Sequence, residues 1–505
     1  MKKILNLIIL FFLLIGFSCT NLDEEIFDNL PGDVYPENSL QVAGLSVNAY
    51  LGMKDLIDDN GWWFLAQEIS SDEFCAPTRD ADWFDGGKWL NMHKHSWTND
   101  EEGVNRMWDK MWSGVTVCNI TLDQMRQLPE SEVIEAKMKE VEVMRSFYYY
   151  LLMDNYGDIP YITSTADAPE KPYKISREAV FDSLTTTIEN NLSALKLIDK
   201  KYLATRYMGF ALLAKLYINA EVYTGTSKWA KADAYIDSVL AGPYSLATKV
   251  GDPFVTDNEN SSEIIFSIPF DEDTYQGFRL HMRTLHYHHN LTYDMPVGPW
   301  NGLCVTPTHF DTYESNDLRK AAYFIYGPQY NSSGNQIIDG GTKQPLVIDP
   351  HLPALYMTAA DFTVNEYRNT GARVGKYEIK MGAKENLSND FPLFRITDFY
   401  LMKAETEIRL GGPGDGDSWI NEIRERADVS IWTGATLDQL LAERGRELFC
   451  EGHRRQDLIR YGKFTNIWWA KGDNQGGVAG DPSVKTFPIP KYASDANPNL
   501  LLDPQ

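Results

Sequence analysis

The sequence is poor in cysteine and in positive charge, and it lacks the short motifs of several common enzyme classes. Its 505 residues include five cysteines, and 47 Lys and Arg stand against 71 Asp and Glu, a net charge of −24. Phosphate contacts need clustered Lys and Arg, so this balance argues against a nucleic-acid-binding protein. It also argues against a basic patch that binds an anionic membrane. No GxSxG, HExxH or P-loop motif occurs.

The cysteines that follow residue 19 show no metal-binding pattern. Cys75, Cys118, Cys304 and Cys450 are widely spaced, with no CxxC and no histidine partner at metal spacing. An even number in an exported protein permits disulfides, but a chain of this length does not need them. We therefore expect buried free thiols and neither a metal nor another cofactor.

Long apolar runs are absent after the first 18 residues. Residues 1–18 begin with Lys2 and Lys3 and continue with an apolar run too short to span a bilayer, which needs ~20 residues. These features predict a signal peptide over 1–18. The sequence GFSC at 16–19 resembles a lipobox, so Cys19 is the expected lipidation site; a plain secreted protein with an incidental Cys19 is the alternative. The acidic residues that follow are similar to the surface-export signal of Bacteroidetes lipoproteins.

Helical periodicity dominates about 40–240 and 395–465. Apolar side chains recur at helical spacing through 132–156, and Gly157 with Pro160 ends that run. Further helices are predicted at about 176–197, 204–222, 228–240, 397–410, 418–427 and 436–450. The pair at 204–240 looks like a tetratricopeptide hairpin, with small residues where helices cross and aromatics between them. We predict a mainly α fold whose scaffold is four degenerate tetratricopeptide-like helix pairs.

Segments 75–100 and 240–395 differ from this scaffold. The second is rich in proline and glycine, with short strand-like runs such as 263–268. Long loops in an exported globular protein usually carry the binding surface. We expect residues 19–505 to form one unit in which these loops and short strands cover the helical scaffold and bind the ligand.

Six runs, in order along the chain, resemble signatures of the SusD/RagB family of outer-membrane nutrient-binding lipoproteins. They are 143–150 with 156–160, 262–267, 389–395, 401–405, 444–462, and 487–490 with 497–500. The resemblance implies a SusD-like fold and a surface-exposed lipoprotein anchored in the outer membrane. It also implies a protein that captures an oligo- or polysaccharide and delivers it to a SusC-like TonB-dependent transporter, without catalysis.

The charged residues of 443–460 have two interpretations. Glu447 and Glu451 with His453 nearby could form a catalytic acid pair. We favour a buried ion network that locks the late helices together, because buried charges must be paired and opposite charges recur at helical spacing, as in Glu443/Arg446 and Glu451/Arg455. By the same reasoning, Arg145 is expected to pair with a carboxylate inside the helix stack.

Two loop segments have the composition of a sugar-binding surface. Sugars present apolar C–H faces ringed by hydroxyls, so their sites combine exposed aromatic planes with polar side chains. Segments 79–97 and 287–302 contain this mixture. We predict that Trp83 and Trp300 stack on sugar rings, and that four polar side chains read hydroxyls at the rim: Arg79, Asp82, Tyr293 and Asn301.

Other aromatic and histidine residues near these segments are expected to have different roles. Trp62 and Trp63 lie in an apolar run and are expected in the core. The histidines of 281–289 lack a familiar zinc spacing and are expected to hydrogen-bond or pack under the loop. The strong negative charge favours a neutral glycan over a polyanionic one.

Three alternatives to glycan capture remain at the level of sequence. They are a peptide-binding member of the same family, a helix-repeat scaffold for surface assembly, and a secreted glycosidase. A binder retains glycan unchanged, an enzyme shortens it, and a scaffold ignores it. Carboxylates alone do not identify a glycosidase, since 71 of them are present.

Overall fold

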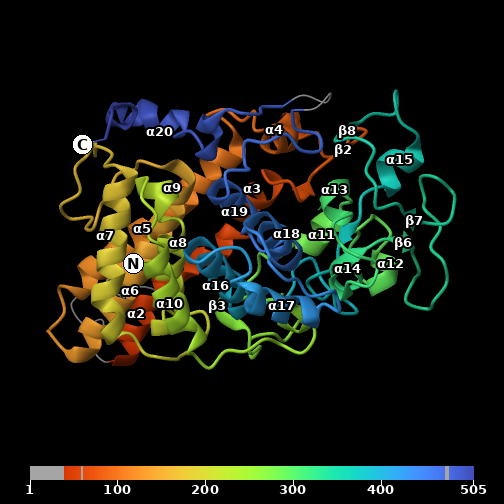
Figure 1. The fold of residues 1–505 in the computed structure, drawn as a ribbon. Coiled ribbons are helices and arrows are strands. Elements are labelled where there is room, and N and C mark those ends of the chain that lie inside the picture. Colours follow the sequence, from red (N-terminus) through yellow and green to blue (C-terminus); the bar gives the residue numbers. More distant parts are fainter. Residues whose placement is uncertain (1–38, 59–60, 473–476, 505) are drawn as a thin grey trace, which may run out of the picture.

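The protein is predominantly helical, as predicted. The computed structural model describes residues 39–58, 61–472 and 477–504; the predicted signal peptide and Cys19 lie outside these ranges. The longest strands have five residues. Figure 1 shows the early helices gathered on one side, the late helices in the middle and the loop-rich segments on the other side. Within the described ranges, no helix combines the length and apolarity that crossing a bilayer requires.

The early helices form the first part of the scaffold. They are α2 (Ser39–Leu51), α5 (Glu102–Met125), α6 (Glu132–Tyr156), α7 (Arg177–Asn191), α8 (Arg206–Ile218), α9 (Ala220–Thr224) and α10 (Trp229–Leu240). Ser131, Ser176 and Thr205 precede α6, α7 and α8, and each side chain accepts a hydrogen bond from the backbone N–H three residues on. These caps satisfy donors that a helix start leaves open, so the polar residues set where the helices begin.

Neighbouring helices pack closely because small residues face large aromatic ones. Gly114 of α5 lies against Tyr148 of α6, and a Cβ there would sit 2.4 Å from the ring. Between α8 and α10, the rings of Tyr217 and Tyr235 stack at 5.6 Å with planes 1° apart. This confirms the helical hairpin predicted for 204–240.

The late helices complete the scaffold. They are α16 (Ile396–Leu410), α17 (Asp417–Arg426), α18 (Leu437–Leu448) and α19 (Arg454–Arg460). Thr436 and Gln439 form the predicted capping box at the start of α18, each side chain bonding to the other residue's backbone N–H. The loop between α16 and α17 is the glycine-rich segment 411–416.

A short antiparallel ribbon joins the scaffold to the loop-rich part. Strand β3 (Ile264–Ile268), which includes most of the run predicted as a strand, pairs with β10 (Phe391–Arg395). Phe266 and Phe394 project from this ribbon onto Phe147 of α6, with ring centroids 5.8 and 6.2 Å from it. One hydrophobic cluster runs on through both regions, from Val42 to Leu500.

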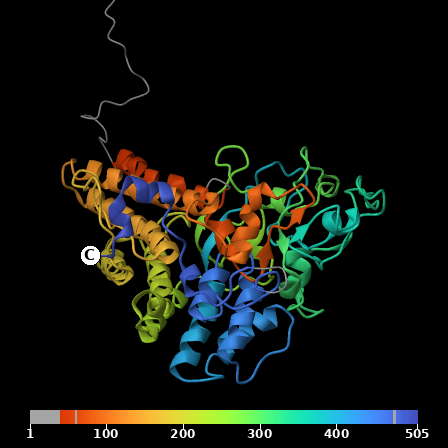
Figure 2. The ribbon, with the colours of Figure 1, turned by 90° about the horizontal axis from the view of Figure 1, so that it is seen from above.

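The remaining elements are short and cover the scaffold. Two-residue strands pair as β1 (Phe74–Cys75) with β4 (Cys304–Val305), β2 (Thr78–Arg79) with β8 (Tyr356–Met357), β5 (Phe324–Ile325) with β9 (Arg373–Val374), and β6 (Gly327–Pro328) with β7 (Val347–Ile348). Short helices are α3 (Trp63–Ile69), α4 (Lys88–Lys94), α11 (Leu280–Thr284), α12 (Asn290–Tyr293), α13 (Pro307–Phe310), α14 (Leu318–Tyr323), α15 (Val364–Asn369) and α20 (Lys491–Ala496). Figure 2 shows α11–α15 extending away from the early helices.

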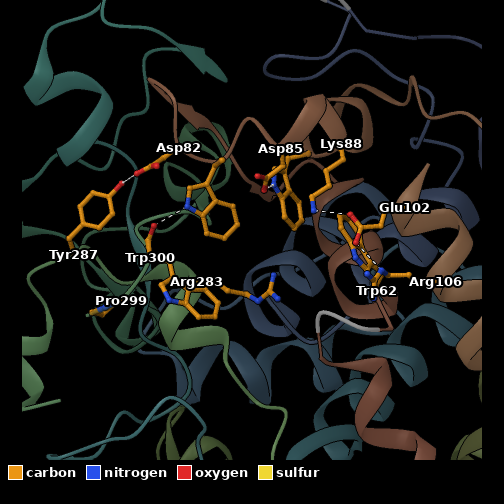
Figure 3. Close-up of a pocket in the computed structure, with 12 residues that line it drawn as sticks. Trp62, Asp82, Asp85, Lys88, Glu102, Arg106, Arg283, Tyr287, Pro299 and Trp300 are labelled. Atoms are coloured by element: carbon orange, nitrogen blue, oxygen red, sulfur yellow. Dashed lines mark hydrogen bonds and ion pairs between the residues drawn. The ribbon is translucent and has the colours of Figure 1, made fainter. Parts of the chain in front are cut away.

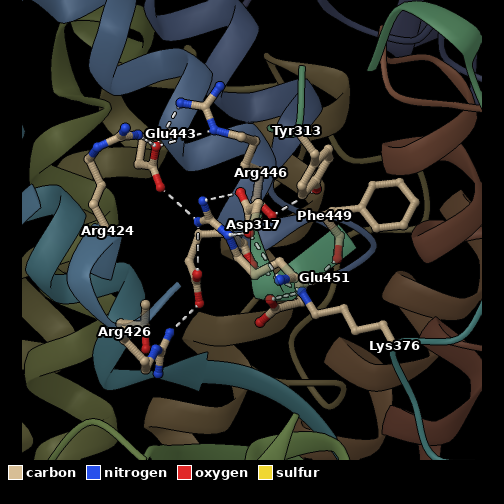
Figure 4. A network of polar contacts seen from close by, with 12 residues as sticks. Tyr313, Asp317, Lys376, Arg424, Arg426, Glu443, Arg446, Phe449 and Glu451 are labelled. Carbon is tan, nitrogen blue, oxygen red and sulfur yellow. Dashed lines mark hydrogen bonds and ion pairs between the residues drawn. The ribbon is translucent and has the colours of Figure 1, made fainter. Parts of the chain in front are cut away.

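A network of buried charges connects the late helices to the loop-rich segments (Figure 4). Glu443, Glu447 and Glu451 are each at most 1% exposed. Their partners within 3.2 Å are Arg319, Lys376, Arg395, Arg424, Arg426 and Arg446. Burial alone would raise the pKa of Glu443 and Glu447, but the surrounding cations outweigh burial and lower both to about 2. The structure therefore confirms the predicted ion network.

Two of the predicted pairings are wrong in detail. Arg455 does not pair with Glu451; it donates to the backbone carbonyl of Lys485, while Glu451 binds Lys376 and Arg395. Arg145 donates to the Asn119 side chain and the Thr163 carbonyl instead of a carboxylate. Helical spacing identifies neighbours on one helix, and these buried arginines find their partners on other elements.

Neutralising one carboxylate of the network should destabilise the protein strongly. We expect Glu447→Gln to lower the free energy of unfolding by about 3–5 kcal/mol in urea titrations, because it removes a buried negative charge that Arg319, Arg395 and Arg426 share. The exposed Glu425→Gln on α17 is the matched control and should change stability by less than about 0.5 kcal/mol. Equal stability of the two variants would contradict the network's role.

The decrease in unfolding free energy caused by Glu447→Gln should also depend on pH. The folded-state pKa of Glu447 is below its ordinary value of 4.5, so its ionised form stabilises the fold fully above that value. This contribution is lost as the pH falls towards about 2. The difference in unfolding free energy between wild type and variant should therefore shrink from pH 4.5 downward.

Candidate aromatic cleft

An open cleft of about 680 Å³ lies where two loop segments meet (Figure 3). Its lining combines aromatic with charged side chains, from 62–106 and 283–300. The lining residues are Trp62, Asp82, Trp83, Asp85, Lys88, Trp89, Glu102, Arg106, Arg283, Tyr287, Pro299 and Trp300. A cleft of this size and composition is typical of a small-molecule or oligomer site.

Three tryptophans from the first segment form one aromatic wall. Trp62 and Trp89 stack with centroids 4.6 Å apart and planes 17° apart, and Trp83 lies 5.4 Å from Trp89 at a 47° tilt. The indole N–H of Trp89 donates to Asp85 at 2.8 Å, and that of Trp83 donates to the Trp300 carbonyl at 2.9 Å. Trp62 and Trp89 are 2% and 4% exposed and cover each other's faces, so the half-buried Trp83 is the member of this wall with an accessible ring.

The backbone around Trp83 positions this wall. The chain turns after β2, where the Arg79 and Asp82 backbones bond to each other in both directions. Trp83 has a φ of 62°, an unusual left-handed conformation for a bulky residue. Its ring then lies flat against Gly302, where a Cβ would sit 2.0 Å from the indole. Glycine at 302 is therefore required for this placement.

Trp300 forms part of the facing side of the cleft. Its backbone N–H donates to the Met282 carbonyl at 2.6 Å, which ties the 299–302 segment to α11. The guanidiniums of Arg279 and Arg283 each lie 6.0 Å from its ring centroid. Burial lowers the pKa of Arg283 to about 10, and Asp58 partly offsets that effect. Arg283 therefore places a cation at the cleft next to an aromatic face.

Polar groups mark the two ends of the cleft in Figure 3. At one end the Tyr287 hydroxyl donates to Asp82, and burial with this contact raises the Tyr287 pKa to about 12. At the other end Glu102 bridges Lys88 at 2.9 Å and Arg106 at 2.8 Å. Both ends offer hydrogen-bonding groups beside the aromatic wall.

Of the six predicted ligand-binding residues, the structure brings three to the cleft surface. Trp83, Trp300 and Asp82 line it. Tyr293 does not: it is half-buried, packs against the core, and burial raises its pKa to about 12.

The other two predicted residues, Arg79 and Asn301, lie beneath the cleft. Arg79 is 2% exposed and donates to the carbonyls of Tyr367 and Thr370. Asn301 is fully buried and accepts from Arg373. Their predicted place at the rim is corrected: they support the segments that carry the tryptophans.

Several cleft residues were not predicted. The sequence could have identified Trp89, because it lies in the same aromatic-rich segment as Trp83. Trp62 is in the core, as its sequence predicts, with 2% of its surface exposed, and it also lines the cleft. Lys88, Glu102 and Arg283 carried no local signal, because only the tertiary fold brings α4, α5 and α11 together.

The histidines near the cleft act as hydrogen-bonding and packing residues. His281 bonds the Lys384 carbonyl at 2.8 Å, His289 bonds Gln329 at 3.1 Å, and His288 accepts from the Gly340 N–H at 2.7 Å. In the part of the chain that the structure describes, no group of three His, Cys, Asp or Glu side chains is arranged to hold a metal ion.

Fold and cleft together define a class: a helical-repeat scaffold whose loops form an aromatic surface cleft. Two family models match the chain, one described as the SusD family over residues 262–502 and one as starch-binding associating with outer membrane over 45–218. The chain belongs to the SusD/RagB family, as its sequence signatures predicted.

Relatives and solved structures agree with this assignment. The starch-binding protein SusD of Bacteroides thetaiotaomicron is 24% identical, with 95% of this chain and 94% of the relative covered. SusD-like protein P25 of Formosa agariphila is 25% identical, covering 99% and 98%. The structure of surface glycan-binding protein A from B. thetaiotaomicron in complex with laminarihexaose has a TM-score of 0.72 at 21% identity, covering 90% and 97%. The structural likeness confirms the predicted SusD-like fold.

Adding one methyl group at Gly302 should disrupt the cleft. In Gly302→Ala the Cβ collides with the Trp83 ring, so we expect loss of the Trp83–Trp300 hydrogen bond and a destabilisation of about 1–3 kcal/mol. Near-ultraviolet circular dichroism should change with it. Gly251→Ala is the control, because a Cβ there meets nothing within 4 Å. An unchanged aromatic spectrum in Gly302→Ala would contradict this packing.

Proposed function

We propose that this protein captures a glycan in the aromatic cleft and does not cleave it. The observation that carries the proposal is an open cleft lined by a preformed tryptophan wall and by Trp300. Sugar rings gain most from flat apolar surfaces with polar groups at their edges, and Asp82 and Tyr287 supply such groups beside Trp83.

The comparisons support the same ligand class. SusD is named for binding starch, and surface glycan-binding protein A was solved with laminarihexaose. A further similar structure is titled as a laminarin-binding SusD-like protein, with a TM-score of 0.71. These glucans are uncharged, and they differ in linkage, so they indicate a glycan without fixing which one.

The charge of the cleft favours an uncharged glycan. Three acidic side chains line it, and three basic side chains balance them: Asp82, Asp85 and Glu102 against Lys88, Arg106 and Arg283. Because the protein has a net charge of −24, it would also repel a polyanion at long range. We therefore propose a neutral oligo- or polysaccharide as ligand.

The acids of the cleft are poorly suited to glycoside hydrolysis. A glycosidase needs one carboxyl group held protonated by a raised pKa. Burial acts to raise the pKa of Glu102, but Lys88 and Arg106 outweigh burial and lower it. Asp82 and Asp85 are engaged by Tyr287 and Trp89. This supports binding over catalysis.

We also propose that the protein acts at the outer cell surface, beside a SusC-like TonB-dependent transporter. A matched family model is described as associating with the outer membrane. In this proposal the lipobox-like sequence before Cys19 supplies the anchor, and the helical scaffold contacts the barrel partner. The cleft is lined by loop residues together with residues of α4, α5 and α11.

Removing either cleft tryptophan should weaken glycan binding. On affinity gels containing neutral polysaccharides, Trp83→Ala and Trp300→Ala should each lower affinity by about ten- to a hundredfold, since each removes apolar surface worth about 1–3 kcal/mol. Trp419→Ala on α17, whose ring packs on Tyr400 away from the cleft, is the control and should bind normally.

Four other outcomes of that screen would redirect the assignment. Unchanged retention in both cleft variants would refute the site. Shortened products would indicate a glycosidase. Retention of peptides without any polysaccharide would indicate the peptide-binding alternative, and retention of neither would favour an assembly scaffold.

The lipid anchor can be tested separately. We expect Cys19→Ala to release the protein from the outer-membrane fraction. Acyl chains hold a lipoprotein at the bilayer, and this variant has no cysteine at residue 19 to carry them. Immunoblots of membrane and soluble fractions measure the shift. Cys118→Ala controls for loss of a cysteine as such, and membrane retention of Cys19→Ala would contradict the anchor.

A further inference from the structure

Two buried arginines and two buried cysteines form a cluster directly beneath the aromatic cleft. Cys75, Arg79, Cys304 and Arg373 come from β1, β2, β4 and β9, and none is more than 2% exposed. Cys75 and Cys304 are opposite each other in the β1–β4 pair, with sulfur atoms 3.7 Å apart. The cluster was not anticipated from sequence, because its members are spread over 299 residues.

In the described part of the chain, neither of the two guanidiniums has a carboxylate as its counter-charge. Arg79 donates to the carbonyls of Tyr367, Thr370 and Gly302, and Arg373 donates to carbonyls and to Asn301. Among the described residues, no carboxylate pairs with either one; the groups that favour their charge are Cys304, Cys75 and Tyr287. A buried charge without a counter-charge is strongly unfavourable, so an anion is needed here.

Cys304 is placed to supply that anion. Its sulfur lies 3.7 Å from Arg79 Nη2 and from the Cys75 thiol, which can donate to it. Burial would raise the pKa of Cys304, but the Cys75 hydrogen bond and the charges of Arg79 and Arg373 outweigh burial and lower it to about 6. Burial and the proximity of Cys304 instead raise the Cys75 pKa, so Cys75 stays protonated.

The remaining surroundings of Cys304 are apolar or uncharged. On the side away from the arginines, the two sulfurs pack in a cluster with Leu352, Leu355 and Met357. Tyr287, His286 and His289 are further titratable groups near the arginines. The Tyr287 pKa of about 12 leaves it neutral, and burial with the charge of Arg373 lowers the pKa of both histidines, so neither carries a charge at neutral pH. Cys304 is therefore the group of this cluster best able to carry negative charge at neutral pH.

The arginines in turn hold the cleft from below. Arg79 binds the carbonyl of Gly302, the residue on which the Trp83 ring lies. Arg373 donates to the side chain of Asn301 at 2.7 Å, and Asn301 follows Trp300 in a left-handed conformation with φ of 55°. These guanidinium contacts add to the backbone hydrogen bonds from 300–302 to Met282, Leu285 and Arg283, and together they position the segment that carries Trp300.

We propose that Cys304 is a buried thiolate and a positioning residue of the cleft: its negative charge holds Arg79 and Arg373, which fix the 300–302 segment under the tryptophans. This role does not require a bound ligand, so it can be tested independently of glycan binding.

The direct test is a pH titration of thiolate ultraviolet absorbance in the folded wild-type protein and its variants. One thiolate should appear with a midpoint near pH 6, while the other thiols stay protonated to pH 9 and above. The signal should vanish in Cys304→Ser and persist in Cys75→Ser, the matched control in the neighbouring strand. No thiolate below pH 8 in the wild type, or a signal that survives Cys304→Ser, would overturn the proposal.

Stability provides a second readout with a definite sign. The folded-state pKa of Cys304 is depressed, so its anion stabilises the fold increasingly as the pH rises from about 6 to 9, and this contribution is lost as the pH falls through about 6. The midpoint of thermal unfolding of Cys304→Ser should therefore fall further below wild type across that window. Cys304→Asp, which restores a negative charge, should recover much of the loss. A pH-independent difference, or Asp behaving like Ser, would mean that Cys304 acts by packing alone.

Discussion

The pairing of buried charges is the constraint on which the rest of this structure depends. Glu447 of α18 meets Arg319 of α14, Arg395 of β10 and Arg426 of α17, so one carboxylate fixes three other elements. Glu451 extends the network to Lys376, and Lys376 lies three residues beyond Arg373, which holds Asn301 under the cleft. Because each buried carboxylate binds cations from several elements, the late helices, the ribbon and the loops are positioned together.

Much of the scaffold could be predicted from sequence, since its signals are local. Apolar spacing identified α6, α8 and α10, and Thr436 with Gln439 marked the start of α18. Helical spacing could not predict which group each buried charge binds. Glu443 does pair with Arg446 three residues on, whereas Arg455 points to the Lys485 carbonyl and Arg145 to Asn119. Such choices depend on which elements meet in space.

The residues of the cleft show the same difference between what the sequence could and could not predict. Composition alone brought out Trp83, Trp300 and Asp82, because a sugar site needs aromatic planes beside polar groups. The same composition drew in Arg79 and Asn301, which are buried and bind backbone and side chains beneath the surface. A polar side chain in an aromatic loop can serve the ligand or hold the loop, and only burial distinguishes these roles.

Backbone strain is concentrated at this cleft. Among the described non-glycine residues, eleven have positive φ, and four of these line the cleft or lie at its base: Trp62, Trp83, Asp85 and Asn301. Each costs on the order of 1–3 kcal/mol and persists only where surrounding contacts impose it. For Trp83 those contacts are Gly302 and the Trp300 carbonyl, and for Asn301 they include Arg373. A wall held in this way is rigid before any ligand arrives, so binding loses little side-chain entropy there. The same reasoning explains why contacts that never touch the ligand, among them the Arg79, Arg373 and Cys304 cluster, determine how well the cleft presents its tryptophans.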